Sequence, residues 1–126
     1  MSTVTKRNIL LVEDIDSIRT LMAHLLRRAG YNVVEAEGGR EAWHRIQEQA
    51  PDLLITDRQM AGGDGIALAI QARESDQTFP IIFMCSEQDE KSMEIIHGIT
   101  PHLLLKPVSP KQLLEKVHEV LHQKAA

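Results

Sequence analysis

Three carboxylates follow directly after two short apolar runs of the sequence. The run at 9–12 ends in Glu13 and Asp14, and the run at 53–56 ends in Asp57. Apolar runs this short, set between stretches with helical periodicity, are typical of buried parallel strands. Ligands of open α/β sheets bind outside the carboxyl ends of the strands. If the two strands are neighbours, the three acids meet at one edge of the sheet.

Acids gathered in this way repel one another. Two unit charges about 4 Å apart, at an effective dielectric constant near 20, cost about 4 kcal/mol. Such a cluster suits a hard cation, because oxygen ligands are those that Mg²⁺ or Mn²⁺ prefers. A third apolar run, 103–105, is followed by Lys106 and Pro107 and adds a positive charge at the same edge. The pattern predicts a place where a metal and a lysine handle a phosphoryl group.

Composition limits the class of protein. The 126 residues fit one domain, 1–126, and the 43% hydrophobic and 25% charged residues are ordinary globular values. A net charge of −4 and only 3% aromatic residues argue against nucleic-acid binding by this domain. No apolar stretch approaches the ~18 residues of a membrane span, and no signal peptide is visible. We expect a soluble cytoplasmic domain with no membrane partner.

Strand and helix patterns alternate along the chain. Strands are predicted at 9–12, 32–36, 53–57, 80–85 and 103–106. Helices are predicted from a cap at Asp16 or Ser17 to Gly30, at 40–50, at 66–73, at 89–97 and after Ser109. Five βα units imply a doubly wound parallel five-stranded sheet with helices on both faces and right-handed crossovers.

Two helices carry finer predictions. On 66–73, we expect the inward positions to be Ile66, Ala67, Ala69 and Ile70. The segment Ser109-Pro110-Lys111-Gln112 has the spacing of a capping box, with proline in the first turn.

In this order and at these strand ends, the motifs resemble those of response-regulator receiver domains of two-component systems. Each motif is common alone, but the ordered set is specific and the resemblance covers nearly the whole chain. It implies the flavodoxin-like strand order 2-1-3-4-5, in which the first and third strands are neighbours. The matching residues are Glu13-Asp14, Asp57, Met60, Asp64-Gly65 and Lys106-Pro107.

The resemblance also implies roles for these residues. Asp57 would be the nucleophile that takes a phosphoryl group from a phosphohistidine of a sensor histidine kinase or a histidine phosphotransfer protein. Lys106 would pair with a phosphoryl oxygen, and a cis bond before Pro107 would fix its direction. Such a domain promotes its own phosphorylation and slow hydrolysis and is not a turnover enzyme. The Mg²⁺ ligands would be Asp14, Asp57, the backbone carbonyl of Gln59, and Glu13 directly or through water.

Departures from the family pattern fall on the switch residues. Cys85 stands where the family has a threonine or serine that bonds the phosphoryl group, and a thiol is a weak donor. Ser86 is adjacent but on a regular strand faces the other way. Leu103 replaces the usual tyrosine or phenylalanine. We therefore expect weak coupling to the face of helix 89–97, strand 103–106 and the last helix, where a downstream protein or a second copy would bind.

Two further positions bear on phosphate lifetime. In the family, the positions of Gln59 and Glu87 flank the path of the hydrolytic water. Both side chains are large enough to order or block that water, so we expect them to modulate hydrolysis.

Three other protein classes and a degenerate form of the receiver domain are alternative interpretations of the sequence. The segment 24–29 superficially resembles the phosphohistidine motif of histidine phosphotransfer bundles, but the five strand signals argue against it. A haloacid-dehalogenase-like phosphatase needs a second aspartate where Gln59 stands, and a flavodoxin needs a phosphate loop where Glu13-Asp14-Ile15-Asp16 would repel a phosphate. The serious alternative is a degenerate receiver that binds proteins without being phosphorylated.

Overall fold

The sheet has the predicted architecture. The computed structural model describes residues 6–60, 64–86 and 90–122. The five parallel strands lie in the order β2-β1-β3-β4-β5, which confirms the doubly wound, flavodoxin-like fold. The strands are β1 (Asn8–Val12), β2 (Asn32–Ala36), β3 (Leu53–Asp57), β4 (Ile81–Cys85) and β5 (Leu103–Leu105).

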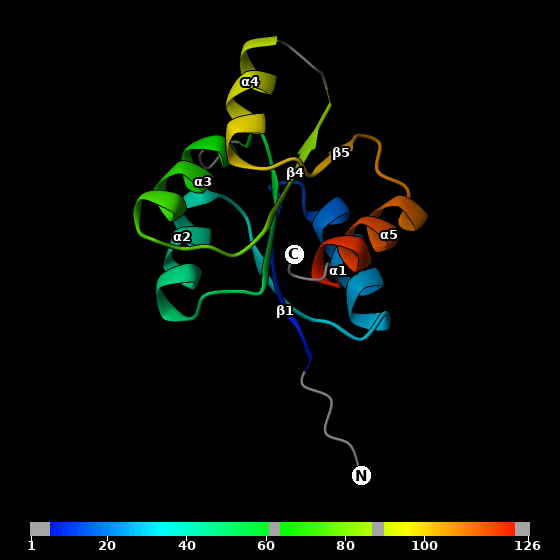
Figure 1. The fold of residues 1–126 in the computed structure, drawn as a ribbon. Coiled ribbons are helices and arrows are strands. Elements are labelled where there is room, and N and C mark those ends of the chain that lie inside the picture. The colour runs from blue at the N-terminus through cyan, green and yellow to red at the C-terminus, as the bar shows by residue number, and fades with distance from the viewer. Residues whose placement is uncertain (1–5, 61–63, 87–89, 123–126) are drawn as a thin grey trace.

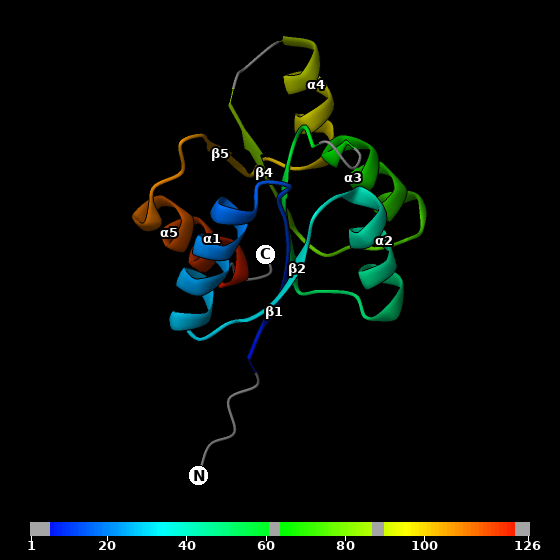
Figure 2. The ribbon, with the colours of Figure 1, turned by 180° about the vertical axis from the view of Figure 1, so that it is seen from behind.

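The helices cover both faces of this sheet. Figures 1 and 2 show α1 and α5 together on one side and α2 and α3 on the other, with α4 at the end of the molecule near α3. The helices are α1 (Asp16–Arg28), α2 (Gly39–Glu48), α3 (Gly65–Glu74), α4 (Glu90–Ile99) and α5 (Pro110–Leu121). Among the residues described, no helix has the length and apolar character needed to cross a membrane.

The central strands are buried on both faces, which explains why their sequences are continuous apolar runs. In β3, Leu53 and Ile55 pack in the core under α1 and α5, whereas Leu54 packs in the core under α2 and α3. In β4, Ile82 and Met84 join the first core, while Phe83 and Cys85 join the second. The strands that end at the acids are therefore fixed by a packed core on each face of the sheet.

Two helix predictions are wrong in detail. The N-cap of α1 is Ile15 rather than Asp16 or Ser17, and no side chain caps this helix, because the carboxylate of Asp16 accepts a hydrogen bond from Arg19 instead. In α3, Ala67 and Ile70 are exposed. The buried positions of α3 are Gly65, Leu68, Ala69 and Ala72.

The inward face of α3 has a physical cause. Its first residue, Gly65, packs against the main chain of Asp57, so positions three, four and seven residues later face inward. At the start of α5, the predicted capping box of Ser109 and Gln112 is confirmed. Strand and helix bounds elsewhere differ from the predicted ones by a few residues at most.

Candidate functional site

The three acids meet at the carboxyl edge of the sheet. Glu13 and Asp14 follow β1, Asp57 is the last residue of β3, and β1 pairs with β3. One carboxylate oxygen from each lies within 4.8 Å of the others. Glu13 is fully buried, Asp57 is buried and Asp14 is half-buried. The structure therefore brings together the acids that the sequence assigns to a metal.

Lys106 enters this cluster from the neighbouring loop after β5. Its Nζ donates to Oδ2 of Asp57 and lies 3.5 Å from both carboxylate oxygens of Glu13. The backbone N–H of Lys106 donates to the carbonyl of Cys85 at 2.8 Å, which ties it to the end of β4. The Lys106–Pro107 peptide bond is cis, as the family resemblance implies.

The cluster changes the acidity of its members. Burial raises the pKa of Glu13 to about 7, and the hydrogen bond and charge of Asp57 push it the same way, while Lys106 partly opposes them. Burial disfavours the charged form of Lys106, but hydrogen bonds and charge from Asp57 and Glu13 outweigh it and raise the pKa of Lys106. Three carboxylates against one amine leave a surplus of negative charge, which a divalent cation would neutralise.

The main chain of Asp57 is held from two sides. The hydroxyl of Thr56 donates to the carbonyl of Asp57 at 3.0 Å. A β-carbon on Gly65 would lie only 1.9 Å from that carbonyl oxygen, so no larger residue fits without displacement. The carboxylate of Asp64 caps α3 by accepting from the N–H of Ile66 at 2.8 Å. The Asp64-Gly65 motif thus begins α3 directly against the main chain of Asp57.

Arg19 supports the acid pair and was missed in the sequence. Its buried guanidinium donates from Nη1 to the backbone carbonyl of Glu13 at 2.8 Å and from Nη2 to Asp16 at 2.7 Å. Nε lies 3.4 Å from a carboxylate oxygen of Glu35 in β2. An arginine next to the apolar stripe of a helix, with an acid in the following strand, was the available signal. Arg19 holds the turn that presents Glu13.

The remaining predicted site residues differ in how exposed they are. Gln59 is exposed, and its backbone N–H lies 3.4 Å from Oδ1 of Asp57. Cys85 is buried in the core under α2 and α3, whereas Ser86 is exposed and lies beside Lys106. Leu103 is half-buried against the same core as Cys85. Glu87 lies outside the described residues.

An apolar cavity opens next to the cluster. It has a volume of about 430 Å³ and lies between α1 and the segment that follows β5. Its polar lining residues are Ser86, Lys106 and Ser109. The aliphatic side chains of Ile18, Leu21 and Val108 line its walls. The site therefore has an apolar surface on one flank.

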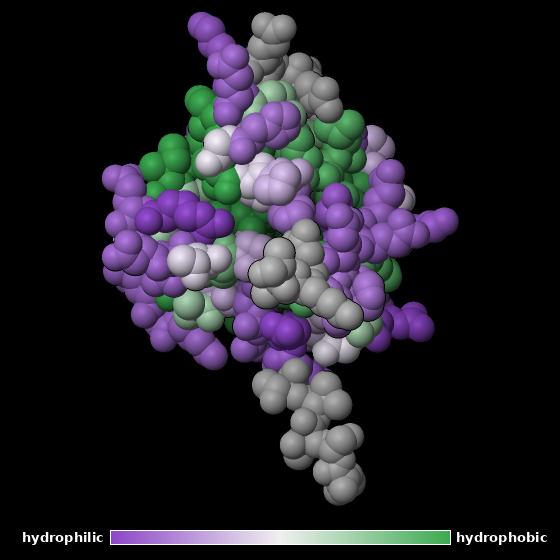
Figure 3. Space-filling view, in the orientation of Figure 1, coloured by the Kyte–Doolittle hydropathy of each residue, from purple (hydrophilic) through white to green (hydrophobic). Residues whose placement is uncertain are grey.

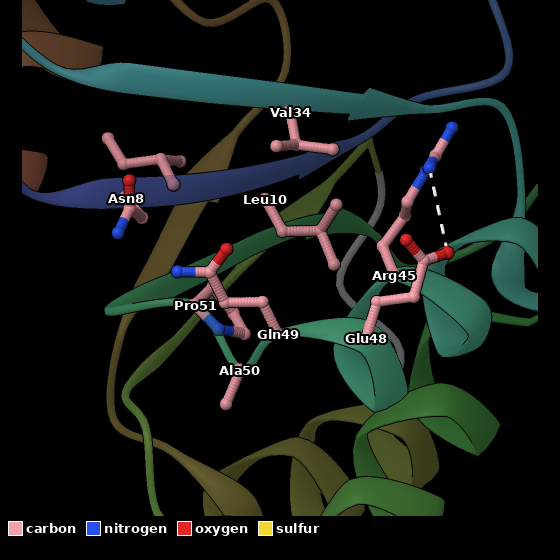
Figure 4. A pocket seen from close by; sticks show the side chains of 9 residues that line it. Asn8, Leu10, Val34, Arg45, Glu48, Gln49, Ala50 and Pro51 are labelled. Carbon is pink, nitrogen blue, oxygen red and sulfur yellow. Dashed lines mark ion pairs between the residues drawn. The ribbon is translucent and has the colours of Figure 1, made fainter.

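A second hollow lies away from the acids. Figure 4 shows it between α2 and the sheet, with Leu10, Val34 and Pro51 around it, and its volume is about 280 Å³. Its charged lining residues, Arg45 and Glu48, form an ion pair at 3.7 Å. This hollow contributes nothing to the acid cluster.

A family model described as the response regulator receiver domain matches residues 9–118. The chain belongs to the response regulator receiver domains. Receiver domains bind Mg²⁺ at an acidic pocket, which agrees with the cluster of Glu13, Asp14 and Asp57. As a family, receiver domains are generally not turnover enzymes. The phosphotransfer-bundle reading is excluded by the parallel sheet.

Curated relatives and solved structures agree with this family. The chain is 32% identical over 119 residues to the alkaline phosphatase synthesis transcriptional regulatory protein PhoP of Bacillus subtilis, covering 93% of this chain and 49% of that protein. It is 33% identical to the transcriptional regulatory protein ResD of Bacillus subtilis, covering 98% of this chain and 51% of that protein. The chain thus spans about half the length of these relatives.

Two solved structures show the same fold at similar identity. The Vibrio cholerae chemotaxis protein CheY4 superposes with a TM-score of 0.87 at 30% identity, covering 93% of this receiver domain and 100% of that chain. A response regulator from Chloroflexus aurantiacus gives a TM-score of 0.85 at 30% identity, covering 94% and 100%.

Proposed function

We propose that this receiver domain is the phospho-acceptor of a two-component phosphorelay. Asp57 takes a phosphoryl group from a phosphohistidine of a sensor histidine kinase or a histidine phosphotransfer protein, in a step that depends on Mg²⁺. The observation that carries the proposal is the position of the Asp57 carboxylate, which lies between two other acids and the amine of Lys106.

The acid cluster fits a magnesium site. We assign Asp14, Asp57 and the backbone carbonyl of Gln59 as ligands, with Glu13 binding directly or through water. Oxygen donors and surplus negative charge are what Mg²⁺ requires, and Mn²⁺ can replace it. When bound, the metal supplies positive charge that neutralises the phosphoryl oxygens during transfer.

The side chains then have distinct tasks. A carboxylate oxygen of Asp57 forms the new O–P bond as the N–P bond of the phosphohistidine breaks, and the electron pair of that bond stays on the imidazole. Lys106 already donates to Asp57, so its amine is in place to pair with a phosphoryl oxygen. The backbone N–H of Gln59, at 3.4 Å from Oδ1 of Asp57, is a second donor on the other oxygen.

The surface of α1 supports a protein as phosphodonor. Ile15, Ile18 and Leu21 are 48%, 37% and 56% exposed and follow each other at helical spacing beside the acids. The apolar cavity beside Lys106 continues this surface. A helical partner that carries the phosphohistidine would bury these side chains while it aims its imidazole at Asp57.

A second exposed apolar surface lies over α4 and β5. Ile95 and Leu105 are both about half exposed, and Figure 3 shows hydrophobic side chains gathered in this part of the molecule. We propose that the α4-β5-α5 face, which carries both residues, binds a downstream protein or a second copy of the domain. We propose no contact of this domain with nucleic acid.

Hydrolysis of the aspartyl phosphate is assigned to neighbouring side chains. Gln59 is exposed and two residues from Asp57, and Glu87 follows β4. We propose that substitutions of Gln59 and Glu87 change the dephosphorylation rate more than the phosphorylation rate. Equal effects on both rates would indicate a disturbed metal site instead.

The acceptor assignment is tested by incubation with Mg²⁺ and acetyl phosphate followed by intact-mass measurement. We expect one phosphoryl group on the wild type and none on Asp57→Asn, because an amide is not an adequate nucleophile. Asp52→Asn is the matched control, since Asp52 precedes the same strand at its other end and accepts from the N–H of Asn8. If Asp57→Asn is phosphorylated to the same extent as the wild type, the assignment of Asp57 as the acceptor is contradicted.

One alternative is favoured by a specific observation. Cys85 has a thiol and Leu103 an aliphatic side chain, so neither supplies a hydroxyl or an aromatic ring to a phosphorylation switch. Both pack in or against the core under α2 and α3. A degenerate receiver that binds partners without phosphorylation fits these two residues. A folded wild type that acquires no phosphoryl group in the same assay would favour this alternative.

A further inference from the structure

Two histidines lie one helical turn apart at the end of α5. They are the outer residues of the segment His118-Glu119-Val120-Leu121-His122, and both side chains are exposed. Histidines four residues apart on a helix lie on the same face, which is the spacing by which helical zinc sites hold their metal. The pair lies roughly 12 to 18 Å along the helix axis from Pro110, the first residue of α5, and takes no part in the acid cluster.

The two imidazole rings are already in contact. Their centroids lie 4.0 Å apart, and their planes are inclined by 25°. The Nδ1 of His122 lies 2.9 Å from the backbone carbonyl oxygen of His118. A carbonyl oxygen only accepts, so Nδ1 carries the proton in this hydrogen bond. In the neutral ring, the lone pair is then left on Nε2 of His122.

This hydrogen bond is of the kind that supports histidines in metal sites. A metal-bound histidine almost always donates its second ring N–H to a carboxylate, a backbone carbonyl or water, which fixes the tautomer of the ring. His122 makes this bond within its own helical turn, so its Nε2 is prepared to be a ligand atom. A metal lies in the plane of each imidazole that binds it, so binding opens the stack. Exposed side chains rotate in this way within picoseconds to nanoseconds.

We propose that His118 and His122 form a binding site for a divalent transition metal such as Zn²⁺. Two imidazole nitrogens suit Zn²⁺, Ni²⁺ or Cu²⁺, whereas Mg²⁺ prefers the oxygen ligands of the acid cluster. The domain then has two metal sites that differ in the metals they select. The histidine site does not depend on phosphorylation of Asp57.

The site offers two protein ligands and leaves the other positions of the metal to water. Among the residues that the structure describes, only the acid cluster brings three potential ligands within 4.8 Å of one another. Glu119 forms an ion pair with Lys116 at 3.5 Å, and Glu115 forms one with Lys111 at 3.9 Å. Catalytic zinc sites hold the metal with three protein ligands. We therefore propose metal binding here and no hydrolytic activity.

The metal would link two residues at the point where α5 ends. The carbonyl of His118 accepts from the backbone N–H of His122 at 2.9 Å as well as from its ring. The last turn of a helix frays most easily, because its final carbonyls have no partner within the helix. A chelate across this turn should therefore slow hydrogen exchange of the His122 amide.

The test is a titration of the ¹⁵N-labelled domain with Zn²⁺ at neutral pH, in an excess of Mg²⁺ to occupy the acid cluster. Long-range ¹H–¹⁵N spectra report on the ring nitrogens of each histidine. We expect the ring resonances of His118 and His122 to shift together and to saturate at one Zn²⁺ per domain. The other four of the six histidines should keep their positions.

Two variants remove one ligand each and keep an exposed polar side chain. His118→Gln and His122→Gln should each weaken Zn²⁺ binding at least about tenfold in calorimetry, since loss of a supporting group alone costs that much in many metal sites. His97→Gln is the matched control and should bind as the wild type does. His97 is exposed in the last turn of α4, and no histidine lies four residues before or after it.

Each result decides for or against the site. If Zn²⁺ shifts neither ring, or shifts only one of them, chelation by the pair is overturned. Unchanged affinity in both glutamine variants, or an equal loss in His97→Gln, overturns it as well. Asp57→Asn should bind Zn²⁺ at the two histidines as tightly as the wild type, so a failure of the phospho-acceptor function would leave this result unchanged.

Discussion

Replacing Glu13 by glutamine should remove a large pH dependence of stability in the metal-free domain. Glu13 is fully buried, and burial together with Asp57 raises its pKa to about 7 from its ordinary value of 4.5. A raised folded-state pKa means that the folded protein holds the proton more tightly than the unfolded chain. Its stabilising effect is complete below pH 4.5 and is lost as the pH rises through 7.

The size of the effect follows from the two pKa values. A difference of one unit corresponds to about 1.4 kcal/mol, so a rise from 4.5 to about 7 corresponds to about 3 kcal/mol of unfolding free energy. The proton belongs to the coupled pair of Glu13 and Asp57, so the titration is a property of both carboxylates. Glu13→Gln places an uncharged side chain of the same size at this position and so removes one titrating carboxylate of the pair.

The assay is urea unfolding in EDTA at several pH values from 4.5 to 8. The unfolding free energy of Glu13→Gln relative to the wild type should increase by about 3 kcal/mol over this range. Taking the difference between the two proteins cancels the histidines, which titrate in both. Glu115→Gln, an exposed position of α5, controls for removing one carboxylate from a chain of net charge −4. A pH-independent difference between Glu13→Gln and wild type would refute the reasoning.

Three further predictions test the supports of the site. Mg²⁺ at ten times its Kd should raise the unfolding free energy by about 1.4 kcal/mol, measured by thermal melts, and Asp14→Ala should lose most of this gain; an unchanged gain would count against the metal site. Gly65→Ala should lower the unfolding free energy by about 1–3 kcal/mol and slow phosphorylation, because its β-carbon would meet the Asp57 carbonyl. The control is Gly98→Ala, which has open space around its β-carbon and should leave the unfolding free energy in urea titrations unchanged or higher. If both variants lose the same unfolding free energy, the close contact of Gly65 with Asp57 is disproved. Arg19→Met should weaken Mg²⁺ binding in calorimetry without removing a ligand, whereas Arg27→Met, which loses another ion pair to β2, should not.

Much of the fold and the cluster could be predicted because simple rules govern them. Strand-length apolar runs identified β1 and β3, and the rule for the carboxyl ends of parallel strands placed Glu13, Asp14 and Asp57 at one edge. Neither rule alone makes β1 and β3 neighbours. That step came from the family resemblance, and the register of β1 with β3 confirms it.

Features that depend on tertiary contacts escaped prediction. The inward face of α3 was misplaced because it is set by the approach of Gly65 to Asp57, and helical periodicity could not reveal that contact. Arg19 and Arg58 looked like surface residues by type. Their burial depends on acceptors from other parts of the chain, which are the carbonyl of Glu13 and the hydroxyl of Ser92.

The same contacts explain how a cluster of mutually repelling carboxylates can be kept in a stable domain. The acids are held by main-chain contacts from rigid elements, with Arg19 behind Glu13 and α3 against Asp57. Lys106 compensates only part of their charge, so we expect a divalent cation to stabilise the site.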